Sequence, residues 1–362
     1  MSAQRQRAHD EPPGSLAQLA CPAPVATRET IVLGHGSGGR LSHELLSRVI
    51  LPALGEDPGF ALEDQASLPL PAAGRLALTT DAFVIRPLIF PGGDIGSLAV
   101  HGTVNDLAVG GARPLYLTVS LILEEGLEIE LLRRVLRSMR RACDEVPLRL
   151  VTGDTKVVDR GKGDGIFITT SGVGLIPEAV TLSATRAKPG DRVIVSGTLG
   201  DHGIAILATR EGIDLETALQ SDSAPLAGLV DAMLGASHGI RCMRDPTRGG
   251  LSSALNEIAA ASNVGIALIE DRVPLRPEVR GACELLGLDP LYVANEGKLV
   301  AIVAAEATDA VLGAMQRHPH GKHAAVIGEV VAAHPKVVTL RSRIGGQRIC
   351  ALLSGEQLPR IC

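Results

Sequence analysis

The chain has 362 residues, 45% of them apolar and only 2% aromatic, and carries a net charge of −5 at pH 7. This length allows two domains of roughly 100 to 200 residues each, while the negative charge and the scarcity of aromatic side chains argue against nucleic acid and anionic membranes as partners. The apolar runs are too short to cross a bilayer, the first residues lack a secretory signal, and the six cysteines form no Cys-x-x-Cys pair. We therefore expect a reduced, cytoplasmic protein.

The first candidate site is a glycine loop. Residues 1–27 are poor in apolar side chains and are predicted to be a disordered extension. The string GHGSGG at 34–39 then stands between a short apolar run and a helical pattern, where backbone N–H groups can bind phosphate. Candidate nucleotide contacts are Gly36, Ser37, Gly38 and Gly39. Because the loop matches neither the Walker nor the dinucleotide pattern, a mobile lid explains it equally well.

Acidic residues follow in the next two elements. The alternating stretch 75–85 is predicted to be a strand with Asp81 near its end. In a helix predicted over 97–111, the apolar positions form one face, and Asn105 and Asp106 fall on another. Asp106 can equally be a solvated surface carboxylate. The helix predicted over 129–143, with Cys143 on its apolar stripe, is interpreted as scaffold.

A strand predicted over 148–151 runs directly into the string GDTK at 153–156. An acid, a hydroxyl and a lysine in succession suit a metal-phosphate group. Asp154, Thr155 and Lys156 are therefore candidate nucleotide contacts. A return strand is predicted over 165–174, and a new alternation of strands and helices begins at residue 192, so we place a domain boundary near 183.

The second half offers two further candidates. The string DPTRGG at 245–250 opens a helix, and its acid, hydroxyl and glycines suit an anion or metal site with Asp245, Thr247 and Gly249 as contacts. An ordinary capped helix fits the same residues. Glu296, in the string NEGK just before a predicted strand, is a candidate general base, although a plain turn residue fits as well. Three histidines at 318–323 lie in a polar turn, and we do not favour metal binding there.

The chain ends in the string LPRIC, so that Cys362 is its last residue. Turn-forming residues precede it, and Pro359 keeps Leu358 extended, which predicts a mobile tail over 344–362. Such a tail can deliver a group bound to the Cys362 thiol, whereas an arbitrary frayed end has no function. A neighbouring carboxylate disfavours the thiolate, so this thiol needs a site that activates it. Cys350 is expected in a strand.

Taken together, four acids can complete a nucleotide site. Carboxylate oxygens hold Mg²⁺ on phosphates, while lysine and backbone N–H groups neutralise the remaining charge. This combination predicts magnesium-ATP, with metal ligands at Asp64, Asp81, Asp106 and Asp245.

Several strings resemble the hydrogenase expression/formation family HypE, the carbamoyl dehydratases of [NiFe]-hydrogenase maturation. They extend from Ile31 to Cys362 and are GHGSGG, TTDAFVIRPLIFPGGD, GTVNDLA, VTGDTKVV, VSGTLGDHG, DPTRGGL, NEGKL and LPRIC. The resemblance implies the superfamily of aminoimidazole ribonucleotide synthetase and selenophosphate synthetase. It implies an α/β fold with an ATP-binding and dimerising N-terminal domain at 28–183, a C-terminal α/β domain at 184–343 and the tail.

The resemblance also implies the reaction. A separate HypF-like carbamoyltransferase places a carbamoyl group on Cys362, ATP phosphorylates its oxygen, and loss of phosphate leaves a thiocyanate. The cyanide then passes to iron on a HypC–HypD-like scaffold complex. Catalytic roles are implied for Cys362, Lys156 and Glu296. Because a carboxylate of ordinary acidity is a weak base for an amide, either burial must raise the pKa of Glu296 or Glu296 must act after phosphorylation has acidified the nitrogen. We favour the second alternative, and His35 or His202 are the other candidate bases.

Two other functions compete with this hypothesis. A synthetase of the selenophosphate or aminoimidazole ribonucleotide type would act on a free small molecule, and it has no need of a reactive cysteine at its end. A non-catalytic cysteine carrier would not hydrolyse nucleotide, in contrast to what the acidic and glycine-rich loops predict.

Overall fold

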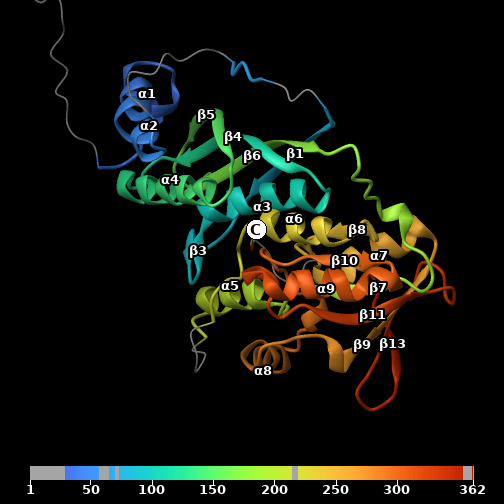
Figure 1. The fold of residues 1–362 in the computed structure, drawn as a ribbon. Coiled ribbons are helices and arrows are strands. Elements are labelled where there is room, and N and C mark those ends of the chain that lie inside the picture. The colour runs from blue at the N-terminus through green and yellow to red at the C-terminus, as the bar shows by residue number, and fades with distance from the viewer. Residues whose placement is uncertain (1–28, 57–64, 70–72, 214–218, 354–360, 362) are drawn as a thin grey trace, which may run out of the picture.

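Two β-sheets organise the chain, one in each half (Figure 1). The computed structural model describes residues 29–56, 65–69, 73–213, 219–353 and 361. The predicted extension at 1–27, Asp64 and Cys362 lie outside the described residues. The first sheet uses strands between residues 75 and 176, and the second uses strands between 192 and 349. Residue 183, where we place the domain boundary, lies between the two.

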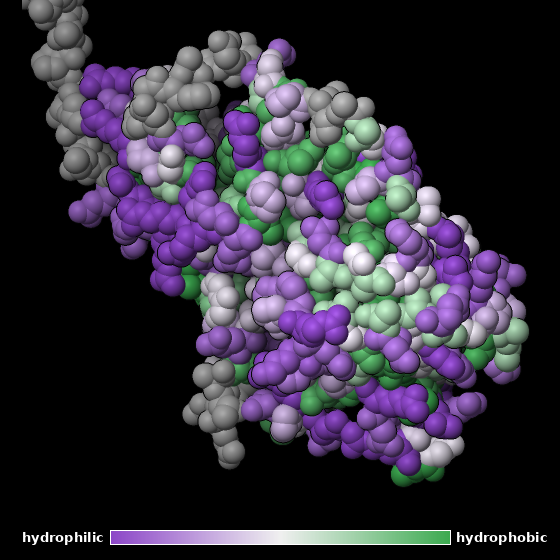
Figure 2. Space-filling model, in the orientation of Figure 1, coloured by the Kyte–Doolittle hydropathy of each residue, from purple (hydrophilic) through white to green (hydrophobic). Residues whose placement is uncertain are grey.

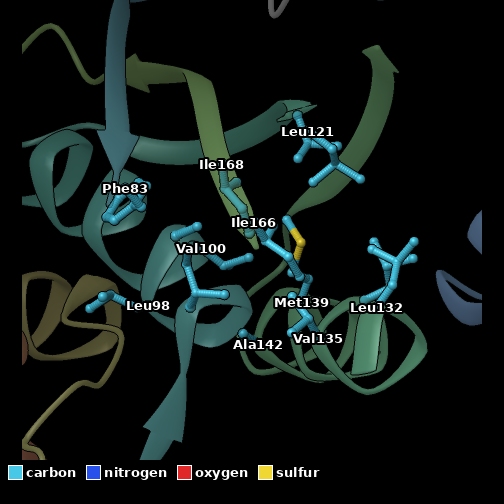
Figure 3. Close-up of a cluster of buried hydrophobic side chains, with 14 of the residues drawn as sticks. Phe83, Leu98, Val100, Leu121, Leu132, Val135, Met139, Ala142, Ile166 and Ile168 are labelled. Atoms are coloured by element: carbon cyan, nitrogen blue, oxygen red, sulfur yellow. The ribbon is translucent and has the colours of Figure 1, made fainter. Parts of the chain in front are cut away.

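The first sheet has four strands and one covered face. Its order is β1 (Arg75–Phe83), β6 (Ile166–Ile176), β4 (Arg113–Glu124) and β5 (Arg149–Val158). The β4–β5 pair is parallel and is joined by helix α4 (Ile129–Asp144), whereas the other pairs are antiparallel. Figure 3 shows apolar side chains of α4, of helix α3 (Ile95–Val109) and of the strands, among them Val100, Met139 and Ile168, packed into a common core.

Helix α3 connects the two halves. Asp94 caps its start, because the Asp94 carboxylate accepts hydrogen bonds from the backbone N–H groups of Gly96 and Ser97. The helix is buried on nearly all sides. It packs on β1, β6 and α4 of the first half and on α6 of the second, and its Ala108 belongs to the second half's core. A helix that is apolar all round requires such cover on every side.

The second sheet has seven strands, of which only β9 and β12 pair in parallel. Its order is β13 (Gln347–Ile349), β12 (Val338–Arg341), β9 (Gly265–Ile269), β11 (Ala325–Val331), β7 (Arg192–Val195), β10 (Val300–Val303) and β8 (Ile240–Arg244). Its helices are α5 (Asp201–Glu211), α6 (Ala227–Ala236), α7 (Gly250–Ser262), α8 (Pro277–Leu286) and α9 (Thr308–Arg317). The remaining elements include the 3-10 helix η2 (Leu33–Gly36), helices α1 (Arg40–Leu45) and α2 (Leu51–Ala53), and strands β2 (Ile89–Phe90) and β3 (Gly93–Asp94). No helix in the described ranges is long and apolar enough to cross a membrane.

Two expectations from the sequence need correction. The string at 153–156 is not a loop after a strand but part of β5, where Gly153 lets the Val119 carbonyl approach to 2.7 Å from the place a Cβ would occupy. Parts of the predicted mobile tail are also held in the fold. Residues 347–349 form β13, and the buried Cys350 follows it with its N–H bonded to the Val338 carbonyl rather than lying within a strand.

Candidate active site

Four carboxylates face one another between the two halves of the molecule. Asp81 comes from β1, Asp106 from α3, Asp245 from the segment after β8, and Glu296 from the segment before β10. Asp106 and Asp245 line a cavity of about 620 Å³ between β1, α3 and β8. The Thr79 hydroxyl donates to Asp106 at 2.7 Å and fixes its orientation. Acids far apart in the chain therefore meet where the two sheets approach α3.

The crowding of these carboxylates changes their acidity. Burial, reinforced by Asp106 and Asp81, raises the pKa of Asp245 to about 7. Burial also raises the pKa of Asp81 and of Asp106, and the neighbouring charges of Arg248 and Arg244 offset only part of the effect. The site therefore holds more negative charge than its surroundings neutralise, and a cation would relieve this repulsion.

Oxygen donors of this kind suit Mg²⁺ rather than a softer metal. Within the described ranges, no three His, Cys, Asp or Glu side chains are arranged to hold a metal ion by themselves. Mg²⁺ commonly takes one or two carboxylates and completes its shell with phosphate oxygens and water. The residues present fit a magnesium-phosphate group better than a metal bound by protein alone.

Glu296 is the most deeply buried of the four acids, with 3% of its surface exposed. Its backbone N–H donates to Asp222 Oδ1 at 3.1 Å, and Asp222 Oδ2 lies 3.0 Å from Lys298 Nζ. Its Oε1 atom has no hydrogen-bond partner among the described residues. Burial, followed by the charge of Asp245 and other acids, raises the pKa of Glu296 well above its usual range. Burial therefore provides the first of the two alternatives considered for Glu296, a raised pKa, although the second was favoured from the sequence.

Asn105 holds the Glu296 backbone in place. Its amide Nδ2 donates to the carbonyls of Ala224 and Glu296, both at 3.1 Å, and its Oδ1 accepts from the Leu226 N–H at 2.8 Å. Both amide hydrogens are thus committed to protein carbonyls in this conformation. Asn105, predicted as a nucleotide contact, reaches the site by supporting Glu296 from α3.

The segment 221–226 links the two halves at this point. Ser221 N–H donates to the Pro91 carbonyl, and a Cβ on Gly297 would lie 1.8 Å from the Asp222 carbonyl oxygen. Sequence reasoning identified neither Asp222 nor Lys298 as functional. The string SDSAPL has no recognisable motif, and only its long-range contacts give it a role. The glycine after Glu296 was the one available signal of close packing.

The predicted helix-start contacts also lie here. Thr247 N–H donates to the Asp245 carbonyl at 3.0 Å, and Gly249 precedes α7 with a φ of +76°. At Gly250, φ is +61° and a Cβ would lie 2.6 Å from the Leu291 carbonyl oxygen, so the turn requires glycine. Asp245 is consequently fixed beside the N-terminus of a helix, which favours anions.

The other predicted contacts form a separate group at β5. Lys156 Nζ lies 2.8 Å from Asp154 Oδ2, and this exposed pairing lowers the pKa of Asp154. A Cβ on Gly36 would lie 2.6 Å from the Val157 nitrogen, so the glycine loop containing Ser37, Gly38 and Gly39 packs beside the same strand. The glycine loop and Lys156 are therefore neighbours along one sheet edge.

Strand register separates this group from the four acids. Asp81 lies in one row across the sheet with the buried Thr170 and Val119 and with Gly153. Asp154 is one residue further along, in the exposed row with Ser120, and Lys156 follows on the same side. Because side chains alternate along a strand, Asp81 points to the helices, whereas Asp154 and Lys156 point away; Thr155 falls on the helix side. The two edge strands are three spacings apart, about 14 Å.

The alternative bases have other partners. His35 Nδ1 accepts from the Val32 N–H at 3.0 Å. Both ring nitrogens of the buried His202 are engaged, one with the Ser221 hydroxyl and one with the Ile361 carbonyl. Ile361 is itself buried, forms a bridge with Ile85, and shares a core with Ala294. Ile361 therefore packs in a core to which both halves of the molecule contribute.

Comparisons with known proteins agree with this architecture. Residues 62–176 match the family described as AIR synthase related protein, N-terminal domain, and residues 188–341 match its C-terminal domain. The carbamoyl dehydratase HypE of Cupriavidus necator is 52% identical over 332 residues, which cover 92% of this chain and 95% of the relative. A structure of hydrogenase maturation protein HypE in complex with ATP aligns with a TM-score of 0.88 at 47% identity, covering 92% of this chain and 100% of that chain. A HypE–HypF complex aligns with a TM-score of 0.75 at 46% identity, covering 77% and 90%. The predicted α/β fold class is confirmed.

Proposed function

The chain belongs to the HypE family of carbamoyl dehydratases, and we propose that it dehydrates a carbamoyl group carried on Cys362 at the expense of ATP. The product is a thiocyanate that supplies cyanide to the iron of [NiFe]-hydrogenase. The observation that carries this proposal is the buried Glu296 carboxylate with an unpartnered oxygen, together with the burial of Ile361, the residue before Cys362, in a core that also contains Ala294. We propose that docking of the tail brings the Cys362 thiol to this base.

The chemistry needs a good leaving group and a base. An amide oxygen leaves poorly, and phosphorylation by ATP converts it into a phosphate ester. The nitrogen then loses its protons as phosphate departs, and a carbon–nitrogen triple bond forms. Glu296 is the proposed proton acceptor, since its raised pKa makes its ionised form a stronger base than an ordinary glutamate. A tethered substrate also meets the site at high effective concentration.

The remaining predicted residues are assigned to the nucleotide. Asp81, Asp106 and Asp245 are proposed to hold Mg²⁺ together with phosphate oxygens, and Asp64 completes the predicted set. The bound ion supplies positive charge to the phosphates. Lys156, as a point charge beside Asp154, is proposed to bind the transferred phosphate together with the glycine loop. Thr247 and Gly249 are assigned to the same nucleotide from the start of α7.

A homodimer would bring the two groups together. In one chain Asp81 and the Asp154–Lys156 pair lie on opposite faces of the first sheet, and among the described residues the face that carries Lys156 exposes Leu76, Leu78 and Ile122. In Figure 2, hydrophobic side chains are visible over the part of the molecule where these strands lie in Figure 1. Two such faces packed together would bury this apolar surface. We propose that one protomer's Lys156 then reaches its partner's carboxylates at the edge strand β1, where the cavity is lined by Leu78 as well as by Asp106.

The proposed partners follow from the reaction. A HypF-like carbamoyltransferase loads Cys362, and a HypC–HypD-like complex accepts the cyanide. We propose a cytoplasmic location for these encounters.

Mass spectrometry of the peptide that contains Cys362 tests the function directly. After incubation with ATP and the carbamoylating partner, the wild-type peptide should gain a carbamoyl group and then lose one water. Cys362→Ala should fold and bind ATP but give no modified peptide. A wild-type peptide that is carbamoylated but never dehydrated in the presence of ATP would contradict the proposal.

A further inference from the structure

His202 joins the docked end of the chain to the segment 221–226. It lies in the first turn of α5 and is fully buried. Its Nε2 atom is 2.6 Å from the Ile361 carbonyl oxygen, and its Nδ1 atom is 2.7 Å from the Ser221 hydroxyl oxygen. The ring also packs edge-on against Phe90, with 5.7 Å between ring centroids. Each polar atom of the imidazole is therefore matched to one specific partner.

The chemistry of these partners fixes the tautomer. A carbonyl oxygen can only accept, so Nε2 must carry the hydrogen. In the neutral ring Nδ1 then accepts from Ser221, whose oxygen in turn accepts from the Ser223 N–H at 3.1 Å. Burial lowers the pKa of His202 and favours this neutral form. The Ser221 N–H also donates to the Pro91 carbonyl. Through Ser221, the His202 ring that donates to Ile361 is therefore linked to the first half of the molecule.

Ile361 is enclosed by residues of both halves. Its backbone forms an antiparallel bridge with Ile85, and its side chain lies in the core that contains Ile206 and Ala294. Ile206 is one helical turn from His202, and Ala294 is two residues from Glu296. The His202 hydrogen bond thus holds Ile361, the residue that precedes Cys362, in a core that also contains Ala294.

We propose that His202 is the positioning residue of the reaction: it holds the carrier tail by the Ile361 carbonyl and so delivers the group on Cys362 to Glu296. This inference rests on the proposed function. His202 does not act as a base while the tail is docked, because both of its ring nitrogens are occupied. Among the described residues, Ile361 is held by this hydrogen bond, by its bridge to Ile85 and by the burial of its side chain, and these contacts must break before the tail can reach a partner protein.

The test measures docking and chemistry separately. His202→Phe keeps a flat ring beside Phe90 and removes both hydrogen bonds, whereas His202→Gln keeps a donor near the Nε2 position. The exposed His238→Phe, before β8, is the matched control. The first readout is the rate at which iodoacetamide alkylates Cys362, followed by peptide mass spectrometry. The second is the single-turnover rate of dehydration of carbamoylated protein with ATP.

We expect His202→Phe to raise the alkylation rate about fivefold, since one hydrogen bond shifts the docking equilibrium by roughly that factor, and to slow dehydration. His202→Gln should fall between the Phe variant and wild type, and His238→Phe should match wild type. If the Phe variant does not fold, Ser221→Ala, which removes the Nδ1 partner and the acceptor of the Ser223 N–H but leaves the imidazole in place, should still raise alkylation. Wild-type alkylation and dehydration in a folded Phe variant would overturn the proposal. Because alkylation needs no ATP, the alkylation rates still test whether His202 holds the tail, even if the protein does not carry out the proposed dehydration.

Discussion

Asp81 and Lys156 project from opposite faces of one four-stranded sheet, although both were predicted to bind the same magnesium-ATP. The alternation of side chains along paired strands makes this separation a property of the register, not of side-chain rotation. Within one chain the sheet therefore lies between the two residues. The proposed homodimer follows from this geometry and can be tested by mixing variants.

Asp81→Asn and Lys156→Ala should each abolish dehydration when present in both protomers. In a mixed dimer one site combines the two substitutions, and the other site has neither. After complete subunit exchange, half of the dimers are mixed and half of their sites are intact, so the mixture should recover about a quarter of wild-type activity. Recovery is measured by dehydration of Cys362 peptides. Exchange without any recovery would show that the two residues act within one chain or at different sites.

The exposed sheet face gives a second test of the dimer. Leu78 on β1 is 76% exposed in the single chain, and Leu78→Asp should place a charge in the proposed interface. The control is Leu285→Asp on α8, because Leu285 is exposed to a similar extent, 77%, in the other half. Light scattering should report monomers for the Leu78 variant and unchanged mass for the control. Equal masses for both variants would exclude this face as the interface.

Local sequence patterns predicted individual helices and strands, but they did not predict the contacts between residues far apart in the chain. Apolar periodicity correctly predicted α4, and alternation predicted β1, because these patterns are local. The partnership between Glu296 and Asp222 joins positions 74 residues apart and has no local signature. Likewise, Gly153 was interpreted as a loop glycine because nothing local reveals that β4 lies against it. The choice between the two alternatives for Glu296 could not be made from the sequence, because burial depends on the whole fold.

Gly297 should be intolerant of any side chain. A Cβ there would lie 1.8 Å from the Asp222 carbonyl oxygen, so Gly297→Ala must displace the segment 221–226 and should cost about 3 kcal/mol or more of unfolding free energy. At Gly281, within α8, a Cβ would meet nothing within 4 Å. Gly281→Ala should be neutral or stabilise by up to about 1 kcal/mol through helix propensity. Urea midpoints of both variants decide the comparison, and similar midpoints would contradict the close packing.

Asp245 should make stability depend on pH. Its pKa is about 7 in the folded chain, so between its ordinary value of 3.8 and pH 7 the folded state binds more protons than the unfolded state. The free energy of unfolding should therefore fall as pH rises through this window, by at most about 4 kcal/mol from this group. Asp245→Asn removes this pH-dependent decrease in the free energy of unfolding. Relative to wild type, the variant should be more stable at pH 8 and equal near pH 3, while ATP binding measured by calorimetry is lost. A constant stability difference across this range would contradict the raised pKa.

Glu296→Gln isolates the proton transfer. The amide retains the size of the side chain and removes a buried, poorly solvated acid, so the variant should fold at least as stably as wild type. It should bind ATP and accept a carbamoyl group on Cys362, since neither step needs a base at this position. Dehydration should fall by at least about a hundredfold, the usual contribution of a positioned general base.

The pH dependence of the dehydration rate in the wild type and in the Glu296→Gln variant distinguishes a catalytic Glu296 from a Glu296 that only supports the turn. Because Glu296 must be ionised to accept a proton, and burial raises its pKa well above the usual range, the wild-type dehydration rate should rise with pH through that raised value. The Gln variant cannot titrate there, so its residual rate should lack that rise. Single-turnover mass spectrometry of the Cys362 peptide provides both profiles. A Gln variant with the wild-type rate would mean that Glu296 only supports the turn, and the base would then be sought among residues that the docked tail leaves accessible.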